Sequence, residues 1–220
     1  MDALRFVVTA GPTREHLDPV RFLSNPSTGR MGFAVARAAR AAGYEVTLVA
    51  GPVALKTPHG VKRIDVVSAR EMLAAVRTAL AEGDGGPTVL VMTAAVADWR
   101  PAVCAVRKLK KASMGGVLRL VRNPDILKSL GRKAKGEVRI GFAAETGDPA
   151  AEACRKCREK GLDLVVANDV TQPGAGFGTN TNRVVLAFPD GHIEPLPLLS
   201  KLAVARRIVR FAEMAAGMET

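Results

Sequence analysis

The chain has 220 residues, enough for one large domain or two small ones, and 48% of them are hydrophobic, which allows a core and excludes wholesale disorder. No apolar run approaches the ~20 residues that a membrane-spanning helix needs, and three cysteines are too few for a disulfide framework. The formal charge is +11 but aromatic residues make up only 4%, so we expect a small polyanionic ligand rather than nucleic acid or a membrane.

Apolar runs alternate with helical patterns along the chain. The N-terminus runs directly into the first of them, without the basic start and apolar block of a signal peptide, so we expect a reduced, cytoplasmic protein. The predicted strands are residues 4–11, 44–52, 61–68, 88–101 (running into a loop), 140–149, 162–174 and 182–191. The predicted helices are residues 31–43, 69–83, 150–161 and 198–217.

This alternation predicts an α/β fold of the Rossmann-like, doubly wound type, in which a mostly parallel sheet carries helices on both faces. Residues 104–127 interrupt the alternation of strands and helices. They are predicted to form a basic arm, a glycine turn and an extended strand, inserted into that fold. No shift in composition marks a boundary, so residues 1–220 are expected to form a single domain. Ligands of such sheets bind beyond the carboxyl ends of the strands, so the residues after each strand are the candidates for a site.

The stretch SNPSTGRMG, Ser24 to Gly32, opens the first predicted helix. One interpretation is an ordinary N-cap, since Ser and Thr accept hydrogen bonds from the first free N–H groups. The other is an anion site, because a helix N-terminus carries a partial positive charge and glycine lets a phosphate approach the backbone. The stretch alone favours neither.

The first strand ends in TAGPTRE, without the glycine fingerprint that dinucleotides require. This weakens one alternative function, a nicotinamide-dependent oxidoreductase. The other alternative is a noncatalytic nucleotide- or nucleic-acid-binding module, which only the charge suggests and which salt-dependent binding of any oligonucleotide without nucleotide turnover would reveal.

Two polar residues are candidates for the site. Asn25 precedes Pro26, which biases its backbone to an extended conformation, and its amide could donate to a substrate oxygen, although a simple turn residue is the commoner explanation. Asp98 follows a strand, where a carboxylate could hold Mg²⁺ or a ribose hydroxyl, or pair with Arg100 at the surface.

A run of basic residues and a pair of cysteines each have two interpretations. Arg107 to Lys111, RKLKK, is either a solvated charge run or a flap over phosphates, and its place between a strand end and glycines favours the flap. Cys154 and Cys157 form an isolated CxxC within a helical pattern, which is more typical of reduced helix residues than of a metal or redox site.

Eight motifs, taken together in their order, resemble the phosphopantothenoylcysteine synthetase (phosphopantothenate–cysteine ligase) family of coenzyme A biosynthesis. They are VTAGPTRE, DPVRFLSNPSTGRMG, VTLVAGPV, AAVADWRP, KLKK, NPDIL, GFAAET and ANDV, and they extend from about Arg5 to about Arg207. The resemblance implies a two-step ligation. CTP activates the carboxylate of 4′-phosphopantothenate as an acyl-cytidylate and releases pyrophosphate, and the amine of L-cysteine then displaces CMP. It also implies dependence on Mg²⁺ and a homodimer with its site near the dimer interface.

The resemblance assigns the nucleotide to the strand ends and the helix start. It implies that Gly11, Ser27 and the stretch from Gly29 to Gly32 contact the nucleotide, all but Gly11 at its phosphates. It implies that Phe142 packs near the cytosine.

Further roles follow from the same resemblance. It implies that Asn25 lies near the acyl intermediate with Arg21 in the preceding turn, and that Ala94 and Ala95 line the pocket. It implies that Asp98 serves the metal or the ribose. It implies that Lys108 opens a flap that closes over the nucleotide.

The chain departs from the family's pattern in three respects. Many bacterial members carry an N-terminal flavin-dependent decarboxylase domain, whereas this sequence starts at the ligase part, so we expect no flavin here and a decarboxylase on a separate chain or on a missing part of this one. Pro26 stands where His is often found, and Trp99 where Tyr is usual. Neither change removes a charged catalytic group.

Overall fold

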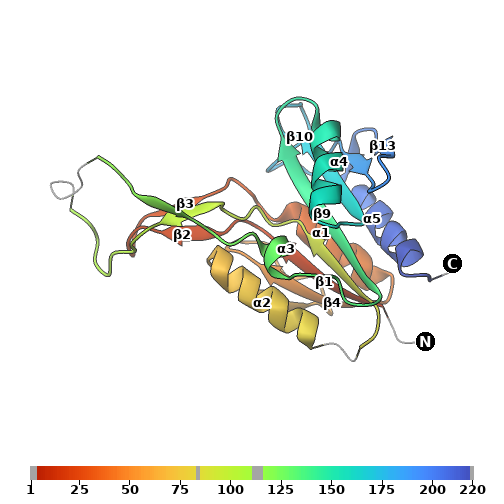
Figure 1. Cartoon of the computed structure of the whole chain (residues 1–220), viewed down its shortest axis with the longest axis horizontal. Helices are drawn as coiled ribbons and strands as arrows, with labels where there is room; N and C mark the ends of the chain where they lie inside the picture. The colour runs from red at the N-terminus through yellow and green to blue at the C-terminus, as the bar shows by residue number, and fades with distance from the viewer. Residues whose placement is uncertain (1–3, 83–84, 111–115, 219–220) are drawn as a thin grey trace.

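The computed structural model describes residues 4–82, 85–110 and 116–218. Its centre is an eight-stranded sheet in the order β13-β12-β10-β9-β6-β1-β4-β5 (Figure 1). These strands are β1 (Arg5–Ala10), β4 (Glu45–Ala50), β5 (Lys62–Asp65), β6 (Thr88–Met92), β9 (Glu137–Glu145), β10 (Leu164–Asp169), β12 (Val185–Ala187) and β13 (Ile193–Pro195).

Six neighbouring strands of this sheet are parallel, and β12 and β13 extend it as antiparallel strands. In chain order the six parallel strands follow the arrangement 3-2-1-4-5-6 that is typical of Rossmann domains. The predicted fold class is therefore confirmed. The order reverses between β1 and β6, and open α/β sheets bind ligands at such a switch point, beyond the carboxyl ends of the strands.

Helices cover both faces of the sheet. They are α1 (Arg30–Ala41), α2 (Ala69–Ala81), α3 (Ile126–Ser129), α4 (Pro149–Glu159) and α5 (Lys201–Ala215). Residues of α1 and α5 pack in one core cluster, while those of α2 and α4 pack in clusters on the opposite face (Figure 1). Within the described ranges, no helix combines the length and apolarity that crossing a membrane requires.

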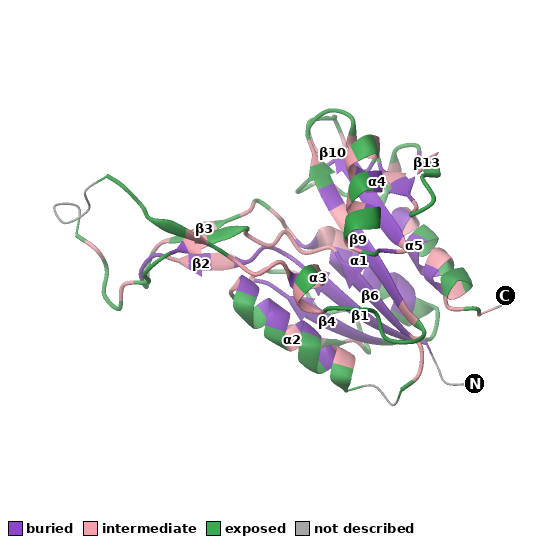
Figure 2. Ribbon diagram, viewed as in Figure 1, coloured by how far each residue is buried: buried purple, intermediate pink, exposed green. Residues whose placement is uncertain are grey.

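The strands form because both of their faces are buried, as Figure 2 shows for the centre of the sheet. In β1 the side chains of Phe6 and Val8 join the α1–α5 cluster, whereas Val7 between them joins the α2 cluster. Burial on both faces explains why parallel strands read as continuous apolar runs, which made them easy to predict.

Two antiparallel pairs form an arm that projects from the sheet (Figure 1). They are β2 (Arg14–His16) with β3 (Phe22–Ser24), and β7 (Trp99–Pro101) with β8 (Leu120–Arg122). The predicted basic arm and extended strand lie here, as the connection from β7 to β8. Lys111 and the first of the predicted turn glycines, Gly115, lie outside the described residues.

Several short elements were not predicted. The β2–β3 pair was missed because three-residue strands carry no readable periodicity. A further short pair joins β11 (Thr181–Asn182) to β14 (Leu199–Ser200), just before α5. This pair brings the start of α5 beside the loop that follows β10.

Candidate functional site

Two adjoining cavities lie at the carboxyl ends of the central strands. The first, about 430 Å³, is lined by the start of α1, the ends of β6, β9 and β10, and the start of α5, and we call it the helix cavity. The second, about 450 Å³, lies between the strand ends, β7–β8 and α3, and we call it the arm-side cavity. Both include Ala94, Val96, Asp98 and Phe142, so these residues mark where the cavities meet.

The backbone after β1 turns at Gly11 and contacts the segment that follows β6. Gly11 turns with φ 79°, and its carbonyl accepts a hydrogen bond from the Ala95 amide at 2.9 Å. A Cβ atom on Gly11 would lie 2.8 Å from Val53 Cγ1. Gly11 is buried and is not among the residues that line either cavity, so what the structure shows for it is a turn between β1 and the segment that follows.

The start of α1 opens into the helix cavity. Its N-cap is Gly29, with φ 77°, and no side chain caps the helix. The Ser27 hydroxyl instead accepts from the Gly29 amide at 3.4 Å. The first N–H groups of α1 therefore have no side-chain acceptor, and such groups together with the helix dipole favour an anion.

Gly32 serves packing as well as the cavity. A Cβ atom there would lie 2.5 Å from Ala10 Cβ, 2.5 Å from Thr93 Oγ1 and 2.8 Å from the Thr9 carbonyl oxygen. Only glycine lets α1 approach β1 and the end of β6 this closely. A role at the phosphates, which the resemblance implies, adds to this and is not needed to explain the glycine.

One cation that lines the helix cavity, Lys201, was missed at the level of the sequence. Lys201 is only 7% exposed, and its ammonium group donates to the carbonyl oxygens of Gly176 at 2.9 Å and Thr179 at 2.7 Å. Burial, and secondarily the nearby charge of Arg30, lower the pKa of Lys201. An isolated lysine at a helix start carries no motif, and only the β11–β14 pairing brings it to the site.

Asn25 lies at the edge of the helix cavity and is fixed from its side chain. Its Nδ2 donates to the Ala95 carbonyl oxygen at 3.0 Å. An amide nitrogen carries two hydrogens, so the second remains for a ligand. The sequence suggested that Pro26 fixes Asn25, whereas this hydrogen bond to the segment after β6 is the more direct restraint.

Asp98 is exposed where the two cavities meet. Nowhere in the described part of the chain do three or more His, Cys, Asp or Glu side chains gather into a group that could hold a metal ion. Mg²⁺ commonly binds through one or two carboxylates together with substrate phosphates and water. Asp98 fits that mode of binding, in which a bound ligand completes the coordination.

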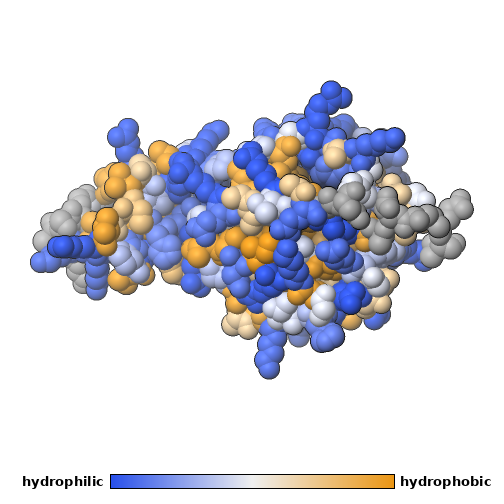
Figure 3. Space-filling view, turned by 90° about the horizontal axis from the view of Figure 1, so that it is seen from below, coloured by the Kyte–Doolittle hydropathy of each residue, from blue (hydrophilic) through white to orange (hydrophobic). Residues whose placement is uncertain are grey.

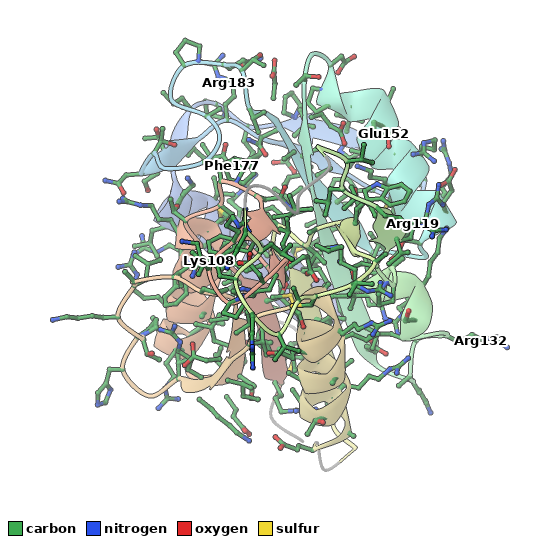
Figure 4. The ribbon with its side chains drawn as sticks, turned by 90° about the vertical axis from the view of Figure 1, so that its left-hand side faces the viewer. Lys108, Arg119, Arg132, Glu152, Phe177 and Arg183 are labelled. Atoms are coloured by element: carbon green, nitrogen blue, oxygen red, sulfur yellow. The ribbon has the colours of Figure 1, made fainter. Side chains whose placement is uncertain are left out.

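The arm holds the other two predicted catalytic residues away from the cavity walls. The guanidinium group of Arg21 pairs with Asp18 and donates to the Leu109 carbonyl oxygen at 2.9 Å. The hydrogen bond from Arg21 lowers the pKa of Asp18 well below its usual range. Lys108, labelled in Figure 4, is exposed on the arm. Neither Arg21 nor Lys108 lines a cavity, whereas Asn25, Ser27, Gly29, Gly32, Ala94, Ala95, Asp98 and Phe142 do.

The cysteine pair lies on the buried face of α4. Cys154 and Cys157 are buried, and the thiol of Cys157 donates to the Leu162 carbonyl oxygen at 3.2 Å. Burial raises the pKa of Cys157 to about 11. Such a thiol is unreactive, in agreement with the prediction of reduced helix residues.

Comparison with known proteins identifies the family. Residues 1–215 match the DNA/pantothenate metabolism flavoprotein C-terminal domain family (DFP). The chain belongs to this family. It is 47% identical over 211 residues to the coenzyme A biosynthesis bifunctional protein CoaBC of Bacillus subtilis, which covers 96% of the chain and 51% of that protein. The chain thus spans about half the length of the curated relatives it matches.

Solved structures of the family share the fold. The crystal structure of the C-terminal domain of a CoaBC protein matches with a TM-score of 0.80 at 42% identity, over 98% of this chain and 96% of that one. A Cab2 mutant in complex with phosphopantothenate-cysteine matches with a TM-score of 0.77 at 16% identity, over 98% and 88%. At that identity the second likeness concerns the fold alone. The predicted resemblance to the synthetase family is confirmed.

Proposed function

We propose that this chain is a phosphopantothenate–cysteine ligase of coenzyme A biosynthesis. In the proposed reaction, CTP activates the carboxylate of 4′-phosphopantothenate as an acyl-cytidylate with release of pyrophosphate. The amine of L-cysteine then attacks the acyl carbon and displaces CMP. Family membership and the named role of the CoaBC relatives support the pathway, and the chemistry of the cavities supports the substrates.

The observation that carries the proposal is the open, cationic start of α1 in the helix cavity. The uncapped N–H groups of α1, together with Arg30 and Lys201 in the same cavity, suit the triphosphate of a nucleotide. The base would then lie toward Phe142 and the arm-side cavity, where Asn123 and Asp125 provide polar groups. In this proposal the α-phosphate would lie near Asp98, where the cavities meet.

The acyl group fits beside Asn25. Ala94 and Ala95 line the helix cavity with small side chains, which leave space for an acyl phosphate. Attack by cysteine puts negative charge on the acyl oxygen, and in this proposal the second N–H of the Asn25 amide donates to it. A donor of this kind stabilises the transition state more than the ground state, because the charge develops only there.

Mg²⁺ in this proposal is held by Asp98 and the phosphates of the nucleotide. When bound, it would neutralise phosphate charge and so favour departure of pyrophosphate. Arg30 at the start of α1 and Lys201 at the start of α5 line the same cavity and would also neutralise phosphate charge.

We also propose that the arm mediates a homodimer. Val103, Val106 and Val117 are 79%, 91% and 90% exposed on the loop from β7 to β8, and Figure 3 shows apolar side chains gathered on the arm. Such exposure is costly in a monomer. Since Arg21 and Lys108 do not line the cavities of their own chain, a second copy could bring them to the site. Sedimentation at micromolar concentration should give a dimer, and an active monomer would contradict the proposal.

The decisive experiment measures pyrophosphate release with CTP, phosphopantothenate and cysteine, omitting each in turn and replacing CTP by ATP. We expect release that requires CTP and phosphopantothenate, and phosphopantothenoylcysteine only when cysteine is present. No release with all three substrates would refute the ligase. Equal rates with ATP would refute the choice of nucleotide alone.

A further inference from the structure

A buried carboxylate in the arm accepts more hydrogen bonds than its own turn requires. Asp18 lies between β2 and β3, and its side chain has no exposed surface. Its Oδ1 accepts from the amides of Val20 at 2.9 Å and Arg21 at 2.8 Å, which closes the turn. Its Oδ2 instead accepts from the Arg21 guanidinium and from the Leu109 amide, at 3.0 and 3.1 Å. The second oxygen therefore connects the turn to a segment 91 residues further along the chain.

Asp18 and Arg21 together bind both backbone groups of Leu109. Asp18 accepts from its N–H, and Nη2 of Arg21 donates to its carbonyl oxygen at 2.9 Å. Paired residues of a β-sheet exchange the same two kinds of bond, so these side chains fix the Leu109 backbone as a neighbouring strand would. A further bond, from the Ala105 amide to the Leu17 carbonyl oxygen at 2.8 Å, holds the same segment closer to β7.

The residue that is held in this way lies between two exposed lysines. Leu109 is half-buried, whereas Lys108 and Lys110 on either side of it are exposed (Lys108 is labelled in Figure 4). Residues 108–110 belong to no helix or strand, so the hydrogen bonds at Leu109 decide where this backbone lies. A charged group lowers a barrier most when it is held in place before the reaction, and a lysine stem is flexible.

We propose that Asp18 is a positioning residue, which presents Lys108 to the nucleotide by fixing the backbone of Leu109. The proposal rests on the proposed function, in which the arm of a second copy brings Lys108 to the site. Closing the turn does not by itself call for a buried charge. An asparagine oxygen would accept the two turn bonds equally well, but its amide nitrogen is a donor and could not accept from the Leu109 N–H.

Asp18→Asn therefore separates the two roles, with pyrophosphate release by the full chain as the first measurement. We expect the rate with saturating CTP, phosphopantothenate and cysteine to fall at least tenfold, but less than twofold when the same change is made in Lys108→Ala. A merely structural role would lower the rate by the same factor in both backgrounds. The matched control is Asp190→Asn, which should keep the rate within twofold of wild type. Asp190 closes an exposed turn by accepting from the His192 amide at 2.9 Å.

Limited digestion with trypsin gives a second measurement, which does not need ligase activity. Trypsin cleaves after Arg and Lys, and the segment contains Arg107, Lys108 and Lys110. Proteolysis requires a locally opened chain, so cleavage there should be at least fivefold faster in Asp18→Asn than in wild type. Asp190→Asn should be cleaved at the wild-type rate.

The outcomes distinguish this inference from the proposed function. An equal loss of rate in both backgrounds, an unchanged rate in Asp18→Asn, unchanged cleavage, or a Lys108→Ala protein with the wild-type rate would each overturn the inference. If Asp18→Asn fails to fold, Leu109→Pro removes the donated N–H and leaves the carboxylate in place; it should slow release at least tenfold, and a wild-type rate would overturn the inference. Faster cleavage of Asp18→Asn, in a protein whose wild type releases no pyrophosphate, would refute the proposed function.

Discussion

Replacing Gly32 by alanine tests how closely α1 must approach the sheet. The new Cβ would meet Ala10 Cβ and Thr93 Oγ1 at 2.5 Å and the Thr9 carbonyl oxygen at 2.8 Å. The carbonyl belongs to the central strand and cannot move aside, and the Thr93 hydroxyl already donates to it at 2.6 Å. The helix start must therefore shift away from β1.

The expected cost combines two opposing terms. Overpacking of this kind destabilises a protein by typically ~1–3 kcal/mol. Alanine is favoured over glycine inside a helix by up to ~1 kcal/mol, which offsets part of that cost. We expect Gly32→Ala to lower the free energy of unfolding by about 1–2 kcal/mol, which for a chain of this size lowers the Tm by roughly 2–8 °C.

Urea unfolding followed by circular dichroism measures this change, with Thr93→Ala as the second arm of a double-mutant cycle. If the collision with the Thr93 hydroxyl matters, Gly32→Ala should cost less in the Thr93→Ala background. Ala41→Gly, at the exposed end of the same helix, reports the propensity term alone. A Gly32→Ala protein with wild-type stability that fails to bind CTP would refute the packing argument and make Gly32 a phosphate contact only.

Three further predictions concern the arm and the acyl site. Lys108→Ala should raise the barrier to acyl-cytidylate formation by ~2.7–4 kcal/mol, as loss of a positioned charge stabiliser does. A variant with wild-type steady-state rates would show that Lys108 is an ordinary surface residue. Asn25→Asp should release pyrophosphate once phosphopantothenate is added but form the cysteine amide very slowly, so that mass spectrometry detects the acyl-cytidylate. Because the new carboxylate faces the Ala95 carbonyl oxygen, that variant should also melt at a lower temperature than wild type; equal loss of both steps would place Asn25 in binding or folding. Since Arg21 lowers the pKa of Asp18, the Asp18 contribution to stability is fully present above the usual aspartate pKa of 3.8 and is lost as pH falls below it. Thermal melts of wild type should therefore decline more steeply below pH 4 than those of Asp18→Asn, and parallel declines would contradict this.

The sequence by itself determined the Rossmann-like class and predicted the edge of the sheet at which the candidate cavities lie. Strands such as Arg5–Ala10 and Leu164–Asp169 are buried on both faces, and helices such as Ala69–Ala81 bury one stripe, so each leaves a periodicity that local reading detects. Parallel strands bring their carboxyl ends to one edge, which is why residues after different strands, such as Ser27, Asp98 and Phe142, could be expected to lie together.

Only the tertiary structure decided what depends on contacts between distant segments. The helix cavity gains Lys201 through the short β11–β14 pair, and two-residue strands leave no pattern in a sequence. The resemblance assigned Arg21 and Lys108 to the site, but neither lines a cavity in the structure. Arg21 is held in the arm by its contacts with Asp18 and the Leu109 carbonyl oxygen. Glycine shows the same division. The sequence does not distinguish the reasons for glycine at Gly11, Gly29 and Gly32. Gly11 and Gly29 adopt a positive φ, whereas Gly32 allows α1 to approach β1 closely. Each reason depends on backbone from elsewhere in the chain that packs against the glycine.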